Sequence, residues 1–144
     1  MNDTALLNEK YPGALTWQFG DSPALADELA QLVLDGLKTA TCTSMVAYQK
    51  ETARGEAPAI GSYSIILNGK GQAVCVIRTL ATSVTRFCDV MPELARKEGE
   101  GDLSLEYWRQ EHRRFFEREG TFSEEMELVF EEFEVVERLD VRET

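Results

Sequence analysis

The segment from residue 63 to residue 77 constrains the fold more than any other part of the chain. Two runs rich in β-forming residues, 63–67 and 73–77, flank the turn sequence Asn68-Gly69-Lys70-Gly71. Asn-Gly is favoured in tight hairpin turns because both residues tolerate a positive φ. The sequence therefore predicts an antiparallel hairpin. The Thr- and Val-rich run 80–87 predicts that the second strand continues past a kink or bulge.

Helical patterns lie on both sides of this hairpin. Ser22-Pro23 supplies an N-cap and a first-turn proline, and apolar residues then recur at helical spacing until Gly36. Similar patterns predict helices over residues 45–54, from residue 89 to the mid-nineties, and over 104–119. Residues 126–136 alternate apolar residues with glutamates and skip one position, which predicts a bulged strand whose glutamates face water.

These elements predict one α+β domain of 144 residues, a length sufficient for a hydrophobic core without metal or disulfide support. We expect residues 1–16 to form a loosely held arm, because they show no periodicity and contain the turn Pro12-Gly13. Residues 17–144 are expected to form the domain. A small curved sheet or barrel with flanking helices fits better than a doubly wound fold, because the antiparallel hairpin dominates.

The composition limits the class of protein. No run reaches the ~20 apolar residues that cross a bilayer, the first 20 residues lack the pattern of a secretory signal, and no membrane partner is expected. Three cysteines without a C-x-x-C pair favour reduced thiols and a cytoplasmic location. With only one histidine, the sequence has no recognisable spacing of metal ligands, so we expect neither a metal nor another cofactor.

The net charge of -11 is unevenly distributed. Residues 123–144 carry nine acids and two arginines, whereas residues 38–97 carry eight bases and four acids. The overall field disfavours DNA and long RNA. A small nucleoside-like ligand or one short single strand of RNA remains compatible with the basic middle of the chain. The oligomeric state is left open by the sequence.

The segment Gly36-Leu37-Lys38-Thr39-Ala40-Thr41-Cys42-Thr43 gathers the most reactive groups of the chain. Threonine is a nucleophile only when a base takes its proton, and lysine is such a base only if its pKa falls toward neutrality. Contact between Lys38 and Thr41 would require the helix end to curl through Thr41, because residues three apart in a strand face opposite sides. The structural alternative is an exposed C-terminal cation followed by a strand hydroxyl.

Several motifs together resemble the ASCH domain, a family of small PUA-like β-barrel proteins. They are Gly36-x-Lys38-x-x-Thr41, Pro58-x-x-Gly61, the segment 98–102 with sequence Glu-Gly-Glu-Gly-Asp, and Trp108-x-x-x-His112-x-x-Phe115-Phe116. The resemblance covers about residues 17–136 and is to the longer bacterial branch of the family. It implies a mixed, mostly antiparallel barrel flanked by helices, with the Gly-x-Lys motif in a cleft.

The resemblance also implies candidate activities. Some small bacterial members are amidohydrolases that remove the acetyl group of N4-acetylcytidine, and by matching positions their catalytic residues become Lys38, Thr41 and Glu98. Other members are described as ribonucleases or RNA-binding proteins. Many members carry glutamate where this chain has Thr41. Three hypotheses therefore remain: an amidohydrolase, an RNA-binding protein or ribonuclease, and a non-enzymatic ligand-binding regulatory module.

Further residues are assigned by their surroundings. Tyr48, Tyr63 and Arg54 lie in the locally basic part of the chain and are the candidate substrate-binding residues. His112 is expected to be a partly buried structural residue of an aromatic stripe, and Cys42 a packing residue. Apart from Glu98, the acids of segment 98–102 are expected to lie in a solvated loop between helices.

Overall fold

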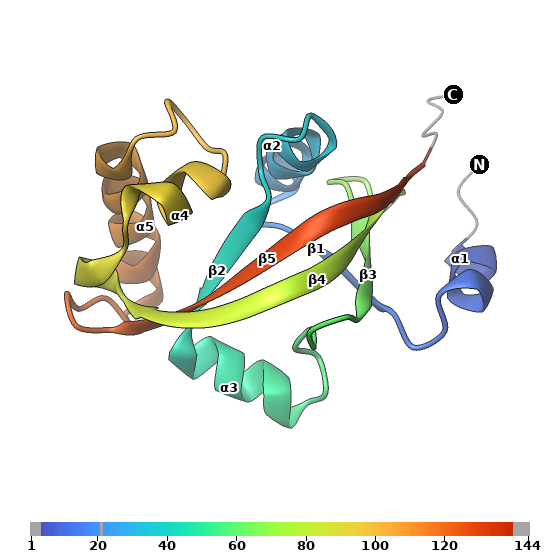
Figure 1. Ribbon diagram of the computed structural model, residues 1–144, viewed down its shortest axis with the longest axis horizontal. Helices are drawn as coiled ribbons and strands as arrows, with labels where there is room; N and C mark the ends of the chain where they lie inside the picture. The colour runs from blue at the N-terminus through green and yellow to red at the C-terminus, as the bar shows by residue number, and fades with distance from the viewer. Residues whose placement is uncertain (1–3, 21, 140–144) are drawn as a thin grey trace. The chain divides into compact units, whose positions relative to one another are not determined.

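A computed structural model describes residues 4–20 and 22–139 (Figure 1). The elements in chain order are α1 (Thr4–Lys10), β1 (Leu15–Gln18), α2 (Pro23–Leu34), β2 (Ala40–Ser44), α3 (Met45–Ala53), β3 (Tyr63–Leu67), β4 (Ala73–Arg86), η1 (Phe87–Asp89), α4 (Pro92–Lys97), α5 (Leu105–Glu119) and β5 (Glu127–Arg138). No helix among the described residues is both long and apolar enough to cross a membrane.

The strands are hydrogen-bonded in the order β1-β3-β4-β5-β2. β3 pairs with β4 and β2 with β5 in antiparallel fashion, whereas β1 runs parallel to β3. The predicted α+β fold with a mixed, mostly antiparallel sheet is thus confirmed. By close contacts the chain divides into two compact units, the first comprising 1–36, 58–80 and 133–144 and the second comprising 37–57 and 81–132.

The first unit contains the predicted hairpin. Residues 68–71 join β3 to β4, and β4 continues to Arg86 as predicted. The register shift in the β3–β4 pairing lies between Ile66 and Leu67, beside the turn, and not after residue 77 where a kink or bulge was predicted. Asp27 of α2 accepts a hydrogen bond of 2.6 Å from the backbone of Gly69. A Cβ on Gly69 would overlap the carbonyl oxygen of Pro23, so the close approach of turn and helix requires glycine at this position.

Two apolar clusters stabilise the first unit. α2 begins as predicted, with Ser22 accepting a hydrogen bond from the amide of Leu25. One cluster packs this helix against the sheet through Phe19, Leu29, Ala30, Val33, Ile66, Val74, Cys75, Ile77 and Phe133. The segment expected to be a loose arm contains α1, whose Leu7 is buried in the other cluster with Ile65, Ala73 and Val76.

The second unit is built around β2 and the first part of β5. These strands pair without a register shift from Ala40↔Glu132 to Ser44↔Leu128, so the predicted bulge does not lie in the β2–β5 ladder over these residues. The apolar core joins this pair to α4 and α5 through Phe87, Val90, Ala95, Trp108, Phe116, Leu128 and Phe130. α5 matches its prediction, with Ser104 as N-cap and Gly120 ending the helix in the left-handed conformation.

Candidate functional site

Lys38 lies in the connection that leads into β2 and is only 2% exposed. α2 ends at Leu34, well before this lysine, and Thr41 belongs to strand β2. The helix therefore does not extend through Thr41. The helical turn that would bring Lys38 into contact with Thr41 is not formed. The Gly-x-Lys motif instead carries the chain out of one unit and into the first strand of the other.

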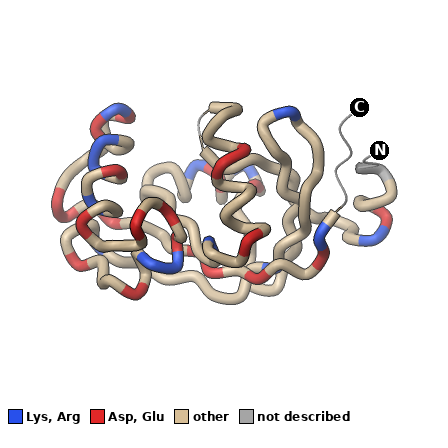
Figure 2. Tube along the Cα trace, turned by 90° about the horizontal axis from the view of Figure 1, so that it is seen from above, with Lys and Arg blue, Asp and Glu red and all other residues tan. Residues whose placement is uncertain are grey.

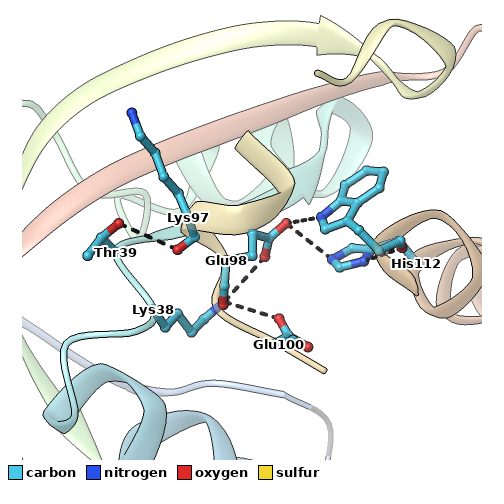
Figure 3. A network of polar contacts seen from close by, with 7 residues as sticks. Lys38, Thr39, Lys97, Glu98, Glu100 and His112 are labelled. Atoms are coloured by element: carbon cyan, nitrogen blue, oxygen red, sulfur yellow. Dashed lines mark hydrogen bonds and ion pairs between the residues drawn. The ribbon is translucent and has the colours of Figure 1, made fainter. Parts of the chain in front are cut away.

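The ammonium group of Lys38 is surrounded by acceptors from segment 98–100. Its Nζ donates to Glu98 Oε1 at 3.2 Å, to the Glu98 carbonyl oxygen at 3.3 Å and to Glu100 Oε2 at 3.3 Å (Figure 3). Two predicted catalytic residues, Lys38 and Glu98, are therefore brought together across 60 positions of sequence. Glu100, expected to be solvated, is instead only 24% exposed at its side chain and shares the lysine.

The second oxygen of Glu98 is held by α5. Glu98 Oε2 accepts a hydrogen bond of 2.6 Å from Trp108 Nε1 and lies 3.2 Å from His112 Nε2. His112 Nδ1 lies 2.9 Å from the carbonyl oxygen of Trp108, which can only accept. An Nε2 that faces a carboxylate and an Nδ1 that faces a carbonyl are both placed to donate, and this arrangement favours the positively charged imidazole. The aromatic stripe of α5 therefore binds a buried carboxylate through Trp108 and His112, in addition to packing in the core.

Electrostatics within the cluster stabilise its charged form. Burial alone would lower the pKa of Lys38, but the carboxylates of Glu98 and Glu100 outweigh it and the pKa is raised. Burial would raise the pKa of Glu98, yet His112 and Lys38 hold it well below its usual range. The pKa of His112 is raised, because the attraction of Glu98 exceeds the effect of burial. Lys38 is thus an ammonium ion at neutral pH and lacks the lowered pKa that a general base requires.

Glycine at position 99 makes this arrangement sterically feasible. Gly99 has a φ of +74°, and a Cβ there would overlap the backbone of Leu37 and Lys38. In the same contact, the amide of Thr39 donates to the carbonyl oxygen of Lys97 at 2.7 Å. The Thr39 hydroxyl lies 3.5 Å from the same oxygen (Figure 3). The end of α4 and the start of β2 therefore meet backbone to backbone, and this places Glu98 beside Lys38.

Cys42 completes the cluster on the helix-facing side of β2, where it packs against the core of the second unit. Burial and the nearby charge of Glu98 hold the pKa of its thiol well above the usual range. Single donor atoms of Cys42, Glu98 and His112 lie within 4.8 Å of one another, a donor set that suits a divalent metal. Because the oxygens of Glu98 already bind Lys38 and Trp108, the cluster is satisfied as an ion-pair network, and we do not assign a metal to it.

Thr41 lies on the other side of β2 from Cys42, because side chains alternate along a strand. Its Cα partner on β5 is Glu131, so both side chains lie on one face of the ladder. Glu131 is only 6% exposed, and its Oε2 has no hydrogen-bond partner among the described residues. Burial, with a smaller effect of Glu51, raises its pKa to about 7.

Glu131 corrects the prediction that the glutamates of this strand face water. Its neighbours at i−2 and i+2, Val129 and Phe133, are both buried, because this face of β5 is covered over residues 129–133. The period-2 pattern places Glu131 on the same face as these two apolar residues, and this was the signal that could have identified it.

The predicted substrate-binding residues have different surroundings. Tyr48 is half-buried on α3, and Arg54, which follows α3, is exposed and forms an ion pair of 2.6 Å with Glu56. Tyr63 belongs to the first unit, where its ring centroid lies 5.0 Å from that of Tyr11. The structure thus places two of the three in the unit that contains Lys38 and Glu98. Their role in substrate binding stays a prediction.

The fold and the buried Lys38–Glu98 cluster define a PUA-like α+β protein. The sequence model of the ASCH domain matches residues 15–137, and the chain belongs to the ASCH domain family. No functionally curated protein matches the chain.

Several solved structures are similar to this chain, and three of them are described here by their match. The ASCH domain from Lactobacillus crispatus JV V101 is 34% identical with a TM-score of 0.79, and the match covers 92% of this chain and 86% of that one. Protein EF3133 from Enterococcus faecalis V583 is 35% identical with a TM-score of 0.79, covering 94% and 86%. Hypothetical protein PH0355, at 17% identity and a TM-score of 0.53 with coverage of 85% and 100%, shares the fold alone.

Proposed function

We propose that the protein is an amidohydrolase that acts on small N4-acylated cytidine-type substrates. The observation that supports this proposal is the burial of Lys38 and Glu98 in direct contact. Burying two charges costs several kcal/mol per ion before their attraction is counted, so such a pair is a poor means of gaining stability. Strongly perturbed ionisable groups gather at functional sites more often than elsewhere. The two residues are also those that match the catalytic lysine and glutamate of amidohydrolases in this family.

The charge states suggest a role for each residue. Lys38, held as an ammonium, stabilises the negative oxygen that develops when the acyl carbonyl is attacked. Glu98 positions that ammonium. Because Thr41 lies on the other side of β2 from Cys42 and this cluster, the attacking group in the proposal is a water molecule and not the Thr41 hydroxyl. Glu100 and His112, with side chains 24% and 14% exposed, form the edge of the cluster that a substrate can reach.

The placement of basic residues favours a small substrate over RNA. Within the basic middle of the sequence, Lys38 is buried with two glutamates, Lys97 pairs with Glu132, and Arg54 pairs with Glu56. On α5 the charges are also mixed in sign, as Figure 2 shows along the helix, with pairs such as Arg113–Glu117. Bases that are already neutralised offer little to a phosphate backbone, whose binding depends on unpaired cations.

The proposal is tested by measuring release of acetate and cytidine from N4-acetylcytidine. We expect turnover by the wild-type protein, and a loss of about a hundredfold or more in kcat for Lys38→Met and for Glu98→Gln. Arg114→Met removes a positive charge from the exposed face of α5 and serves as the matched control, with activity unchanged. Circular dichroism verifies that each variant is folded.

Absence of turnover in the wild-type protein would contradict the proposal. RNA binding that weakens steeply with salt, without release of acetate, would instead support the RNA-binding alternative. A thermal shift with cytidine but no product would support a ligand-binding module.

A further inference from the structure

The acceptors around the Lys38 ammonium differ in their access to solvent. Two of them belong to Glu98, the carboxylate oxygen Oε1 at 3.2 Å and the carbonyl oxygen at 3.3 Å, and a third is Glu100 Oε2 at 3.3 Å (Figure 3). The side chains of Lys38 and Glu98 are 1% and 2% exposed, whereas that of Glu100 is 24% exposed. Of these three acceptors, the Glu100 carboxylate is therefore the one that borders solvent.

The number of donors on Lys38 limits how a ligand can reach it. An ammonium group has three N–H bonds, and three acceptors are sufficient to engage all of them. A ligand oxygen therefore binds Lys38 Nζ by replacing an acceptor that is already there. Glu98 is also held by Trp108 Nε1 at 2.6 Å, so its carboxylate has a second anchor. Glu100 is the acceptor that a ligand can replace.

The main chain beside Glu100 is closely packed, so the exchange requires movement of the side chain alone. A Cβ at Gly99 would lie 2.7 Å from the backbone nitrogen of Lys38, and a Cβ at Gly101 would lie 2.4 Å from the ring of Tyr107. These contacts fix the backbone on both sides of Glu100. A glutamate side chain has three rotatable bonds, and rotation about them moves its carboxylate into water while the backbone stays in place.

The balance of charge indicates which ligand suits the vacated position. With Glu100 in place, the ammonium of Lys38 and the positively charged imidazole of His112 face two carboxylates, those of Glu98 and Glu100. Rotation of Glu100 into water leaves two cations and one anion in the interior. An uncompensated buried charge is unfavourable, so a ligand with one negative charge restores the balance and a neutral ligand does not.

We propose that Glu100 is a specificity-determining residue, whose carboxylate occupies the position on Lys38 that a small carboxylate or a substrate oxyanion takes. The inference rests on the proposed function for the identity of the substrate, but exchange at Lys38 does not require turnover. A neutral amide competes poorly with the charged Glu100 side chain. The oxyanion formed on attack by water competes well, so Lys38 binds the reacting state in preference to the ground state.

The test measures the affinity of the full chain for acetate, the carboxylate that hydrolysis of an acetyl amide would release. His112 is the only histidine of the sequence, so its ring resonances in NMR spectra report on this cluster unambiguously. Glu100→Ala removes the competing carboxylate and should tighten acetate binding about tenfold or more relative to the wild type. Acetamide, which has the shape of acetate without its charge, should show no such gain.

A matched variant separates a local effect from a general change in charge. Glu106→Ala removes an acidic side chain from the exposed first turn of α5 and should bind acetate as weakly as the wild type. Glu100→Gln keeps the size of the side chain and removes its charge, so it should also tighten acetate binding. Thermal unfolding verifies that each variant is folded, and acetate should raise the unfolding temperature of Glu100→Ala.

The possible outcomes distinguish this inference from the proposed function. Equal acetate affinity in Glu100→Ala and the wild type, or an equal gain for acetamide, would overturn the inference. Tighter acetate binding in a protein that does not hydrolyse N4-acetylcytidine would uphold the inference and reject the proposed substrate class. Hydrolysis without any response of His112 to acetate in Glu100→Ala would support the proposed function and reject the role of Glu100.

Discussion

Lys38 Nζ lies 3.2 Å from Glu98 Oε1, and the two side chains are only 1% and 2% exposed. Glu98 supplies the largest attraction that keeps Lys38 charged, and His112 together with Lys38 keeps Glu98 charged. Lys38 lies in the connection to β2, Glu98 follows α4, and α5 contacts Glu98 through Trp108 and His112. The pair therefore links the start of β2 to both α4 and α5. The first prediction concerns the energy of this link.

Lys38→Met should destabilise the protein by about 3–5 kcal/mol, because it leaves the charge of Glu98 poorly compensated. Urea denaturation measures the change. Combining Lys38→Met with Glu98→Gln should cost less than the sum of the two single changes. Arg54→Met, which breaks the exposed pair with Glu56, is the control and should cost less than about 1 kcal/mol. Additive effects of Lys38→Met and Glu98→Gln would show that the two charges are not coupled.

His112→Gln should reduce stability in a manner that depends on pH. The folded pKa of His112 is raised, so its stabilising effect is fully present below the unfolded pKa of about 6.5 and is lost as the pH rises through the folded pKa. The difference between variant and wild type should therefore be largest in mild acid and shrink in mild alkali. Chemical denaturation at a series of pH values measures it. A difference that grows with pH would contradict the assigned charge.

Glu131→Gln should stabilise the protein at alkaline pH. The pKa of Glu131 is raised from 4.5 to about 7 on folding, so the penalty for its charge develops between these values and is complete above pH 7. From the size of that pKa shift, the free energy of unfolding of Glu131→Gln should exceed that of the wild type by about 3 kcal/mol near pH 8. The difference should vanish near pH 4. Glu134→Gln, an exposed position of the same strand, should give no such profile. Equal denaturation midpoints for wild type and Glu131→Gln at pH 8 would refute the prediction.

Gly99→Ala should reduce the stability of the protein by much more than the backbone strain of a positive φ alone. Both Gly99 and Gly55 have a positive φ, +74° and +71°, but only at Gly99 would a Cβ overlap neighbouring backbone. Gly55→Ala should therefore cost roughly 1–2 kcal/mol, whereas Gly99→Ala adds the separation of Lys38 from Glu98. Thermal unfolding of the two variants measures the difference. Similar losses in both would show that the backbone contact at Gly99 can relax.

The fold was largely predictable because its signals are local. The turn at 68–71, the cap at Ser22 and the stripe of α5 each depend on residues close in sequence, and all three appear in the structure. α1 was missed because a helix of seven residues leaves a weak periodic pattern, and its anchor Leu7 is buried only through residues distant in sequence.

The candidate site was predictable only in part. Lys38 and Glu98 were identified through family resemblance, and the structure brings them into contact. The roles of Glu100, Trp108 and Glu131 depend on which chain segment lies opposite each of them, and a single sequence does not contain that information. The charge state of Lys38 was undetermined for the same reason, since it depends on two carboxylates 60 and 62 positions away.

The stacking of Trp108 on His112 has a practical consequence. Their ring centroids are 4.2 Å apart with an interplanar angle of 16°, and the indole nitrogen donates to the same carboxylate that faces the imidazole. A protonated imidazole is an efficient quencher of indole emission. With Trp17 replaced by phenylalanine, Trp108 is the only tryptophan left in the sequence, so its fluorescence becomes an intrinsic optical probe of this interior. Ligand entry and proton uptake could then be followed in real time without an attached dye.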